Sequence, residues 1–152
     1  MIIIGYPGIG KSTLAGKLNC IDLESSLFNN SNGNKYSDWT DYYCKIADDL
    51  SKQGYNVFIS SHSLVRTKIK KISKEKIFCI IPSMTLKDEW INRLKKRAER
   101  TKLDKDIRAY IYVKSNFENN ISEMRSSGFN YYIIKDMNYK LEKIIKDIVD
   151  KK

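Results

Sequence analysis

A phosphate-loop pattern placed directly after an apolar run is the feature that most limits how this chain can fold. Met1–Ile4 is an apolar run typical of a buried strand, and Gly5–Ser12 then reads G-x-x-x-x-G-K-S. Glycines allow the backbone to curl around a phosphate chain with several N–H groups pointing inward. Such a loop lies between a strand and a helix, and we expect that helix over Lys11–Asn19. The sequence therefore predicts an α/β fold.

The same pattern predicts which atoms would hold a nucleoside triphosphate. Lys11 can reach the β- and γ-phosphates, and the hydroxyl of Ser12 can ligate Mg²⁺. The predicted nucleotide-binding residues are Gly5, Tyr6, Pro7, Gly8, Ile9, Gly10, Lys11, Ser12 and Thr13. The segment could be a glycine turn that arose by chance. This is disfavoured, because a predicted strand precedes the segment and a helical pattern follows it. We expect the chain to bind ATP or GTP with magnesium.

The length and the cysteine content limit the class of protein to which the chain can belong. The 152 residues are enough for one domain, spanning 1–152, with a hydrophobic core. Cys20, Cys44 and Cys79 are far apart and form no C-x-x-C pair, which disfavours a zinc site or a disulfide framework. No stretch approaches the ~20 apolar residues of a membrane span, and the apolar start is too short for a signal peptide. We expect a cytoplasmic protein with no membrane partner.

The formal net charge of +10 allows two interpretations. A basic surface can attract nucleic acid or anionic substrates. Alternatively, the excess of Lys over Arg, with abundant Ile, Asn and Tyr, is the composition that an AT-rich genome produces. We favour the second interpretation, so nucleic acid is a partner that the charge permits but does not favour.

Strand-like and helix-like patterns alternate along the chain, which predicts a parallel sheet covered by helices. Strands are expected at Met1–Ile4, Cys20–Leu23, Asn56–Ser60, Lys76–Ile81 and Asn130–Ile134. Helices are expected at Lys11–Asn19, Asp38–Gln53, Leu64–Ile69, Leu86–Arg100, from Asp104 or Asp106 to about Ser126, and at Asn138–Val149. The Asn-rich stretch Ser25–Tyr36 is expected to be a mobile loop. Five parallel strands in a three-layer sandwich would place ligands at the carboxyl ends of the strands.

Two carboxylates follow the second predicted strand. Alternation along a strand puts Asp22 and Glu24 on the same side, close to the phosphate loop. One could hold a magnesium water while the other orients or deprotonates an acceptor hydroxyl. The alternative is a turn in which Asp22 or Ser25 caps the next segment.

A basic helix follows the fourth predicted strand. Arg93, Arg97 and Arg100 are three or four residues apart and share one helix face. Guanidinium groups suit a phosphoryl group in transfer, whose charge spreads over three oxygens. A solvated basic face is the alternative, and the position after the fourth strand favours the functional interpretation.

Two absences narrow the class of nucleotide-binding protein. Neither the third strand, which ends at Ser60-Ser61, nor the fourth, which ends at Pro82, supplies the terminal Asp of motor and transporter ATPases. The base-reading tetrapeptide N-K-x-D of switch GTPases is also missing, since Asn34-Lys35 is followed by Tyr36-Ser37. A motor ATPase or a switch GTPase is therefore disfavoured.

The chain resembles the small P-loop kinases of the nucleoside monophosphate kinase group, with shikimate and gluconate kinases as cousins. The most specific likeness lies in Gly5–Ser12 and in Arg93–Asp106, which is similar to the arginine- and aspartate-rich lid that folds over ATP. The resemblance implies a five-stranded sheet of order 2-3-1-4-5, an acceptor-binding insert at about 24–54 and a short helical lid at about 93–108.

The resemblance also implies roles for individual residues. Arg97 matches a lid arginine, and Asp104 and Asp106 resemble the paired aspartates of the lid, although Lys105 separates them. Arg66 stands where the family places an arginine for the acceptor phosphate, and Asp22-Leu23-Glu24 resembles the D-x-D acceptor site of shikimate kinases. The chain departs from the family because no arginine occurs between residues 24 and 65.

Aromatic residues and one histidine have two interpretations each. Trp39, Tyr42 and Tyr43 lie on the expected acceptor helix, where they could stack on a base or belong to the core, and the core is favoured. His62 is the only histidine and follows the third strand. It could contact an acceptor phosphate, act as a base or serve a structural role.

Together these features predict an ATP- and Mg²⁺-dependent kinase, with a nucleoside monophosphate as the acceptor and a monomer or homodimer as its state. Its predicted catalytic residues are Lys11, Arg97, Arg93, Arg66 and Glu24, and its predicted metal ligands are Ser12 and Asp22. One alternative is a kinase of a polynucleotide 5′ end or of a small hydroxyl metabolite. Another is a nucleotide-binding regulatory module without turnover.

Overall fold

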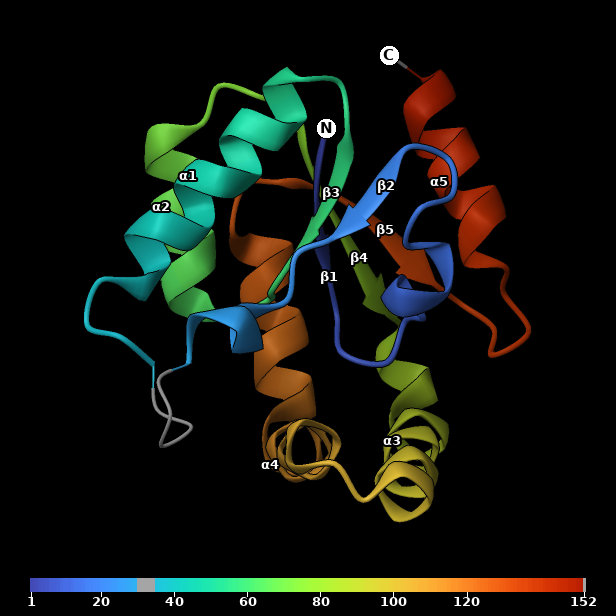
Figure 1. Ribbon diagram of the computed structural model, residues 1–152. Helices are drawn as coiled ribbons and strands as arrows, with labels where there is room; N and C mark the ends of the chain where they lie inside the picture. Colours follow the sequence, from blue (N-terminus) through green and yellow to red (C-terminus); the bar gives the residue numbers. More distant parts are fainter. Residues whose placement is uncertain (30–34, 152) are drawn as a thin grey trace. The chain divides into compact units, whose positions relative to one another are not determined.

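A computed structural model describes residues 1–29 and 35–151 and shows an α/β fold with a five-stranded parallel sheet (Figure 1). The strand order is β2-β3-β1-β4-β5, which confirms the predicted order. The strands are β1 (Ile2–Gly5), β2 (Cys20–Asp22), β3 (Asn56–Ile59), β4 (Ile77–Pro82) and β5 (Asn130–Ile134). The helices are α1 (Trp39–Lys52), α2 (Ser63–Ile72), α3 (Lys87–Thr101), α4 (Asp104–Ser126) and α5 (Leu141–Asp150). This arrangement is compatible with a three-layer sandwich.

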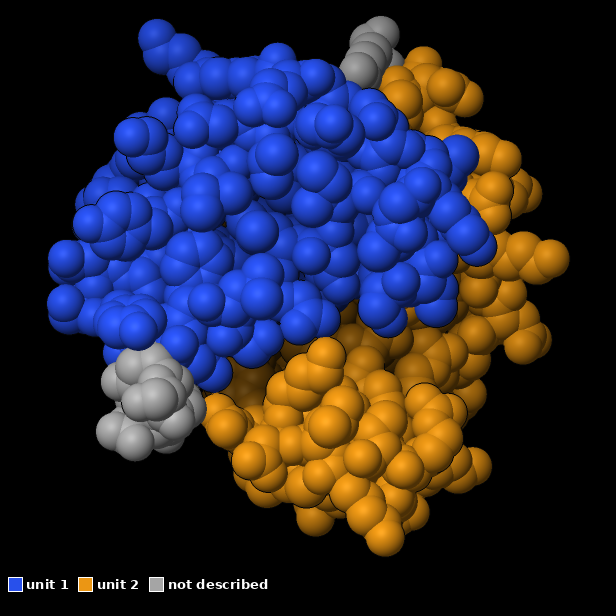
Figure 2. Space-filling view, in the orientation of Figure 1, with its two compact units in different colours: residues 1–5, 11–78 blue, residues 6–10, 79–152 orange. Residues whose placement is uncertain are grey.

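The chain divides into two compact units (Figure 2), and by residue number the division runs through the predicted phosphate loop. Unit 1 comprises residues 1–5 and 11–78, and unit 2 comprises residues 6–10 and 79–152. The glycine-rich turn of the motif thus belongs to unit 2, while Gly5 and the residues from Lys11 onward belong to unit 1.

Unit 1 is built on three strands whose pairing follows from their apolar sequences. β1 pairs in parallel with β3, with Ile2 opposite Val57 and Ile4 opposite Ile59, and β2 pairs with the other edge of β3. All four of these side chains are buried, as expected of central parallel strands. Helices α1 and α2 pack against each other, and α1 also contacts β1 and β3.

Unit 2 has an aromatic core. Helices α3 and α4 pack together, and the rings of Trp90, Phe117 and Tyr6 are fully buried among them. Tyr6 meets Phe117 edge to face at 5.8 Å and lies 6.3 Å from Trp90. The second residue of the phosphate loop is therefore anchored in the hydrophobic core of this unit.

The helix predicted over Lys11–Asn19 is wrong. The structure has one 3₁₀ turn at Lys11–Leu14, and Gly16, Leu18 and Asn19 then take positive φ values of 80°, 52° and 59°. Glycine is a poor helix residue, and left-handed conformations cannot continue a right-handed helix. The short connection to β2 is thus irregular, and the phosphate loop has no long helix behind it to supply a dipole.

The other predicted elements agree with the structure to within a few residues. The longest, α4, spans Asp104–Ser126 as expected, and β5 has the predicted bounds. In the Asn-rich stretch Ser25–Tyr36, Ser25–Phe28 forms a 3₁₀ turn, while residues 30–34 lie outside the described residues. Among the helices that the structure describes, none is long and apolar enough to cross a membrane.

The end of α1 gives a first test of the backbone geometry. Gly54 follows the helix with φ of +99°, and a β-carbon at this position would meet nothing within 4 Å. We predict that Gly54→Ala lowers the free energy of unfolding by about 1–2 kcal/mol, because an L side chain is strained in the left-handed region. Gly54→Asn should lower the free energy of unfolding by less than Gly54→Ala does, since Asn tolerates this conformation. Urea unfolding of the three proteins measures the difference, and equal stability of Gly54→Ala and the wild type would contradict it.

Candidate phosphate-binding and acceptor sites

In unit 2, three side chains bind three successive carbonyl groups of the phosphate loop. The indole Nε1 of Trp90 donates to the Pro7 carbonyl at 2.8 Å, and the guanidinium of Arg93 donates to the Gly8 carbonyl at 3.2 Å. The hydroxyl of Tyr139 donates to the Ile9 carbonyl at 2.8 Å. The carbonyl oxygens of the loop therefore face α3 and the segment after β5.

The direction of these carbonyls fixes the direction of the loop amides. In a trans peptide the C=O and the following N–H point in opposite directions, and the chain has no cis peptide among its described residues. The N–H groups of Gly8 and Gly10 consequently point away from Trp90 and Tyr139. The N–H of Ile9 donates to the Tyr6 carbonyl at 3.3 Å. Positive φ values at Gly8 (89°) and Gly10 (99°) make this curled arrangement accessible.

Arg93 is held by the loop and by two aromatic rings. Its guanidinium carbon lies 4.8 Å from the centroid of the Trp90 ring and 5.3 Å from that of Tyr139, and these two rings stack at 16°. It also donates to the Tyr139 hydroxyl at 2.7 Å and to the Met137 carbonyl at 3.3 Å. Burial raises the pKa of Tyr139, although Arg93 acts in the opposite direction, so the hydroxyl keeps its proton at neutral pH and can donate to Ile9.

The other two arginines of the predicted lid have different surroundings. Nε of Arg97 lies 3.3 Å from a carboxylate oxygen of the buried Asp106, an ion pair without the geometry of a hydrogen bond. Asp106 also accepts a hydrogen bond from Thr101 at 2.6 Å. Arg100 and Asp104 are exposed. The three arginines of the predicted face thus have three different environments, and only Arg93 touches the phosphate loop.

In unit 1, the remaining motif residues follow the end of β1. Nζ of Lys11 donates to the Gly5 carbonyl at 3.2 Å, so the lysine side chain folds back over the start of the motif. Ser12 and Thr13 are exposed. Ser12 therefore presents an accessible hydroxyl, while Tyr6 and Ile9, each 1% exposed, can offer a ligand only their backbone atoms.

Tyr43 joins the ends of β2 and β3. Its hydroxyl donates to the Leu23 carbonyl at 2.5 Å and accepts from the Ser60 N–H at 2.8 Å. Burial raises the pKa of Tyr43, the hydrogen bond from the Ser60 N–H acts in the opposite direction, and the carboxylates of Asp22 and Glu24 raise the pKa further, so the hydroxyl stays protonated and can donate. The predicted carboxylate pair is thus brought to the end of β3. The turn after it, Ser25–Phe28, has no side-chain cap, although Glu24 accepts from Ser26 at 3.2 Å.

Arg66 and His62 lie at the end of β3 and the start of α2. Nε of the buried Arg66 donates to the Ser61 carbonyl at 2.9 Å. Nδ1 of His62 accepts from the Leu64 N–H at 3.2 Å and caps α2, and its ring meets Trp39 edge to face at 5.9 Å. The structural role considered for His62 is therefore present as a helix cap.

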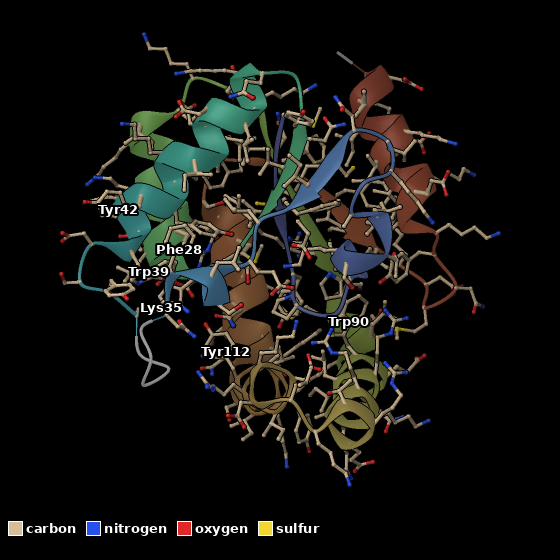
Figure 3. The ribbon with its side chains drawn as sticks, viewed as in Figure 1. Phe28, Lys35, Trp39, Tyr42, Trp90 and Tyr112 are labelled. Atoms are coloured by element: carbon tan, nitrogen blue, oxygen red, sulfur yellow. The ribbon has the colours of Figure 1, made fainter. Side chains whose placement is uncertain are left out.

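The aromatic residues of α1 mostly belong to the core. Tyr43 is fully buried and Trp39 is 9% exposed, and they meet each other edge to face at 5.8 Å. Phe28 packs on Tyr43 at 5.5 Å, and Nζ of Lys35 lies 5.4 Å from the Trp39 ring centroid (Figure 3). Tyr42, by contrast, is 61% exposed, so it is the one aromatic of this helix with an open ring face.

The residues predicted to hold magnesium have suitable chemistry. Ser12 offers a hydroxyl and Asp22 a carboxylate, and Mg²⁺ prefers oxygen ligands while keeping several waters. Within residues 1–29 and 35–151, no group of three or more His, Cys, Asp or Glu side chains could hold a metal alone.

Comparison with known proteins gives no assignment, since no family model and no curated protein matches the chain. The geometry also adds residues that sequence reasoning missed. Trp90 precedes Arg93 by three positions, the spacing that places both on one helix face, and this signal could have found it. Tyr139 is 130 positions from Ile9, and no local pattern connects the two.

Gly8 tests how closely the loop approaches α3. A β-carbon added here would lie 3.0 Å from Cδ2 of the buried Leu94 and 3.2 Å from Nε1 of Trp90. We predict that Gly8→Ala lowers the free energy of unfolding by about 2 kcal/mol or more, because steric overlap adds to backbone strain. Gly54→Ala is the matched control, with a similar φ and open space. Equal losses for the two variants in urea unfolding would contradict the close approach.

His62 gives a prediction about pH. Loss of solvent around the ring lowers the pKa of His62, and the charges of Arg66 and Lys35 lower it further. The unfolded chain therefore binds this proton at a higher pH than the folded one, so the free energy of unfolding should fall as pH falls through about 6.5.

Two measurements check this expectation. Imidazole NMR titration should give a pKa below about 6.5 in the folded protein. His62→Asn keeps a capping oxygen but does not titrate, so its stability should vary less with pH over about pH 5 to 8. A folded-state pKa of 6.5 or above would refute the expectation.

Proposed function

We propose that this chain is an ATP- and Mg²⁺-dependent phosphotransferase, with a nucleoside monophosphate as its acceptor. The observation that carries the proposal is the binding of the Pro7, Gly8 and Ile9 carbonyls by side chains, which turns the N–H groups of Gly8 and Gly10 to the other side of the loop. Backbone N–H groups arranged in this way bind phosphate oxygens. Lys11, whose Nζ lies at the start of the motif, would add a positive charge for the β- and γ-phosphates.

Magnesium fits the proposal as a cofactor held by Ser12 and, through water, by Asp22. When bound, it would neutralise charge on the β- and γ-phosphate oxygens. The protein's own part is to orient the phosphates through the loop and to present Lys11 to their negative charge.

The acceptor side of the proposal is supported by groups at the ends of β2 and β3. Arg66 and His62 lie together there, and Arg66 is the stronger candidate for an acceptor phosphate because its guanidinium is always charged and suits phosphate oxygens. Glu24 would orient the acceptor group that attacks the γ-phosphate. The exposed ring of Tyr42 is available for a base, while Trp39 and Tyr43 are committed to packing.

The proposed lid contains fewer arginines than the sequence pattern predicted. Arg97 remains the candidate for contact with the transferring phosphoryl group, because its side chain is one-third exposed although its Nε is buried beside Asp106. Arg93 is already bound to the loop, which gives it a different proposed role, developed below.

The activity is tested by a screen for ADP release and for transfer to an acceptor. The acceptors are all nucleoside and deoxynucleoside monophosphates, shikimate, gluconate and 5′-hydroxyl oligonucleotides. Transfer to a monophosphate supports the proposal. Transfer to oligonucleotides, with an affinity that falls steeply with salt, would favour a polynucleotide kinase, for which the exposed Lys95, Lys96 and Arg100 and the net charge are suited.

Lys11→Ala is the decisive variant. We predict Mg·ATP binding roughly 10- to 100-fold weaker, because a charged interaction with the phosphates is lost, and a larger loss in transfer. Lys17→Ala removes an exposed lysine six positions further on and is the matched control, expected to behave as the wild type. Calorimetry measures binding, and the coupled assay measures transfer.

The outcomes separate the possible functions. Full activity in Lys11→Ala would exclude the loop as the catalytic phosphate site. Tight Mg·ATP binding by the wild type without transfer to any acceptor would indicate a regulatory module. No heat with any Mg·NTP would contradict the proposal altogether.

A further inference from the structure

We infer that Trp90, Arg93 and Tyr139 form a brace that sets the phosphate-binding shape of the loop, and that Arg93 is a positioning residue and not a lid arginine. The inference rests on the proposed function and adds to it residues that act on the nucleotide only through the loop. It concerns unit 2 alone, in which the loop residues 6–10 and all three side chains lie.

The brace provides a side-chain donor for every carbonyl from Pro7 to Ile9. Each of the three successive carbonyls has its own donor, at 2.8, 3.2 and 2.8 Å, and the donors come from α3 and from the segment before α5. A loop that presents its amides in one direction must place its carbonyls in the other, where they need partners once they are shielded from water. The three side chains supply those partners before any ligand binds.

Arg93 is the centre of the brace. It spans from the Gly8 carbonyl to the Tyr139 hydroxyl and the Met137 carbonyl, so three acceptors share one fork of donors. The stacked rings of Trp90 and Tyr139 hold the plane of the guanidinium by cation–π contact. An arginine fixed in this way would have to break these contacts to reach a phosphate, so it serves better as a rigid part of the loop.

Tyr139 links Arg93 to the loop through two successive hydrogen bonds. Its hydroxyl accepts from Arg93 at 2.7 Å and donates to the Ile9 carbonyl at 2.8 Å. A hydroxyl polarised by a cation is a stronger donor, because linked hydrogen bonds strengthen one another. The same pull makes the following N–H, that of Gly10, a better donor to an anion on the opposite side of the peptide.

Two conservative variants test the brace without emptying the core. Tyr139→Phe keeps the stacked ring and removes the hydroxyl, and Arg93→Lys keeps the charge but loses the fork. We expect Mg·ADP affinity to fall by about 2- to 12-fold in Tyr139→Phe, the loss of one hydrogen bond, and by roughly 10-fold or more in Arg93→Lys. Arg125→Lys and Tyr131→Phe are matched controls, because this second Arg–Tyr pair of unit 2 has its guanidinium 5.8 Å from the ring and is expected to leave affinity unchanged.

Amide hydrogen exchange of the loop in the absence of nucleotide is the readout that general destabilisation would not reproduce. We expect faster exchange of the Ile9 amide, whose N–H donates to the Tyr6 carbonyl, in Tyr139→Phe and Arg93→Lys. Exchange there should be as in the wild type in the controls, with exchange in β3 unchanged in all four. Faster loop exchange together with weaker Mg·ADP binding supports the inference. Unchanged loop exchange in both variants, or faster exchange with unchanged affinity, overturns it.

Failure of the proposed function is recognised separately. If the wild type binds no Mg·NTP, the phosphotransferase proposal fails before any variant is compared. Loop exchange then decides the brace by itself, since the three hydrogen bonds either hold the loop in the free protein or do not.

Discussion

The hydrogen bonds from side chains to three consecutive loop carbonyls are the interaction on which the rest of the candidate site depends. A peptide unit is rigid, so each bound carbonyl also sets the direction of the following N–H. By binding the loop carbonyls, Trp90, Arg93 and Tyr139 therefore also orient the amide N–H groups of the loop. The burial of Tyr6 and Ile9 adds hydrophobic anchoring to the same turn. A glycine-rich segment, flexible by composition, is thereby restrained in one conformation.

Under the proposed function, this restraint would direct the loop amides although no long helix follows the loop. Only a 3₁₀ turn follows the motif, because Gly16, Leu18 and Asn19 adopt positive φ values before β2 begins. The contribution of a helix dipole is correspondingly small. In the proposed site, directed amides, the charge of Lys11 and the polarisation of the loop by Arg93 would be the sources of positive potential.

At the ends of β2 and β3, another tyrosine hydroxyl, that of Tyr43, joins two segments. Tyr43 bridges the Leu23 carbonyl and the Ser60 amide, and thus brings the segment containing Asp22 and Glu24 to the segment that leads to His62 and Arg66. An aromatic residue that packs in the core also fixes the polar ends of two strands. The loop at Ile9 and the ends of β2 and β3 are therefore each held by a tyrosine hydroxyl.

Local sequence patterns determined where most strands and helices of this protein lie along the chain. The apolar runs and the 3.6-residue periodicity placed all five strands and the long helices within a few residues, because these signals act between near neighbours. The motif likewise singled out the glycine-rich turn that follows β1, and His62 was singled out by its position after a strand. Arg66 was singled out by the resemblance to small P-loop kinases.

Only the tertiary structure decided how those residues are used. Arg93, Arg97 and Arg100 look equivalent in sequence, yet one binds the loop, one pairs with Asp106 and one is exposed, because their partners come from distant segments. Tyr139 could not be found from sequence, since 130 positions separate it from Ile9 and no period spans that distance. Trp39 and Tyr42 follow the same helical pattern, but the surrounding packing buries the first and leaves the second open.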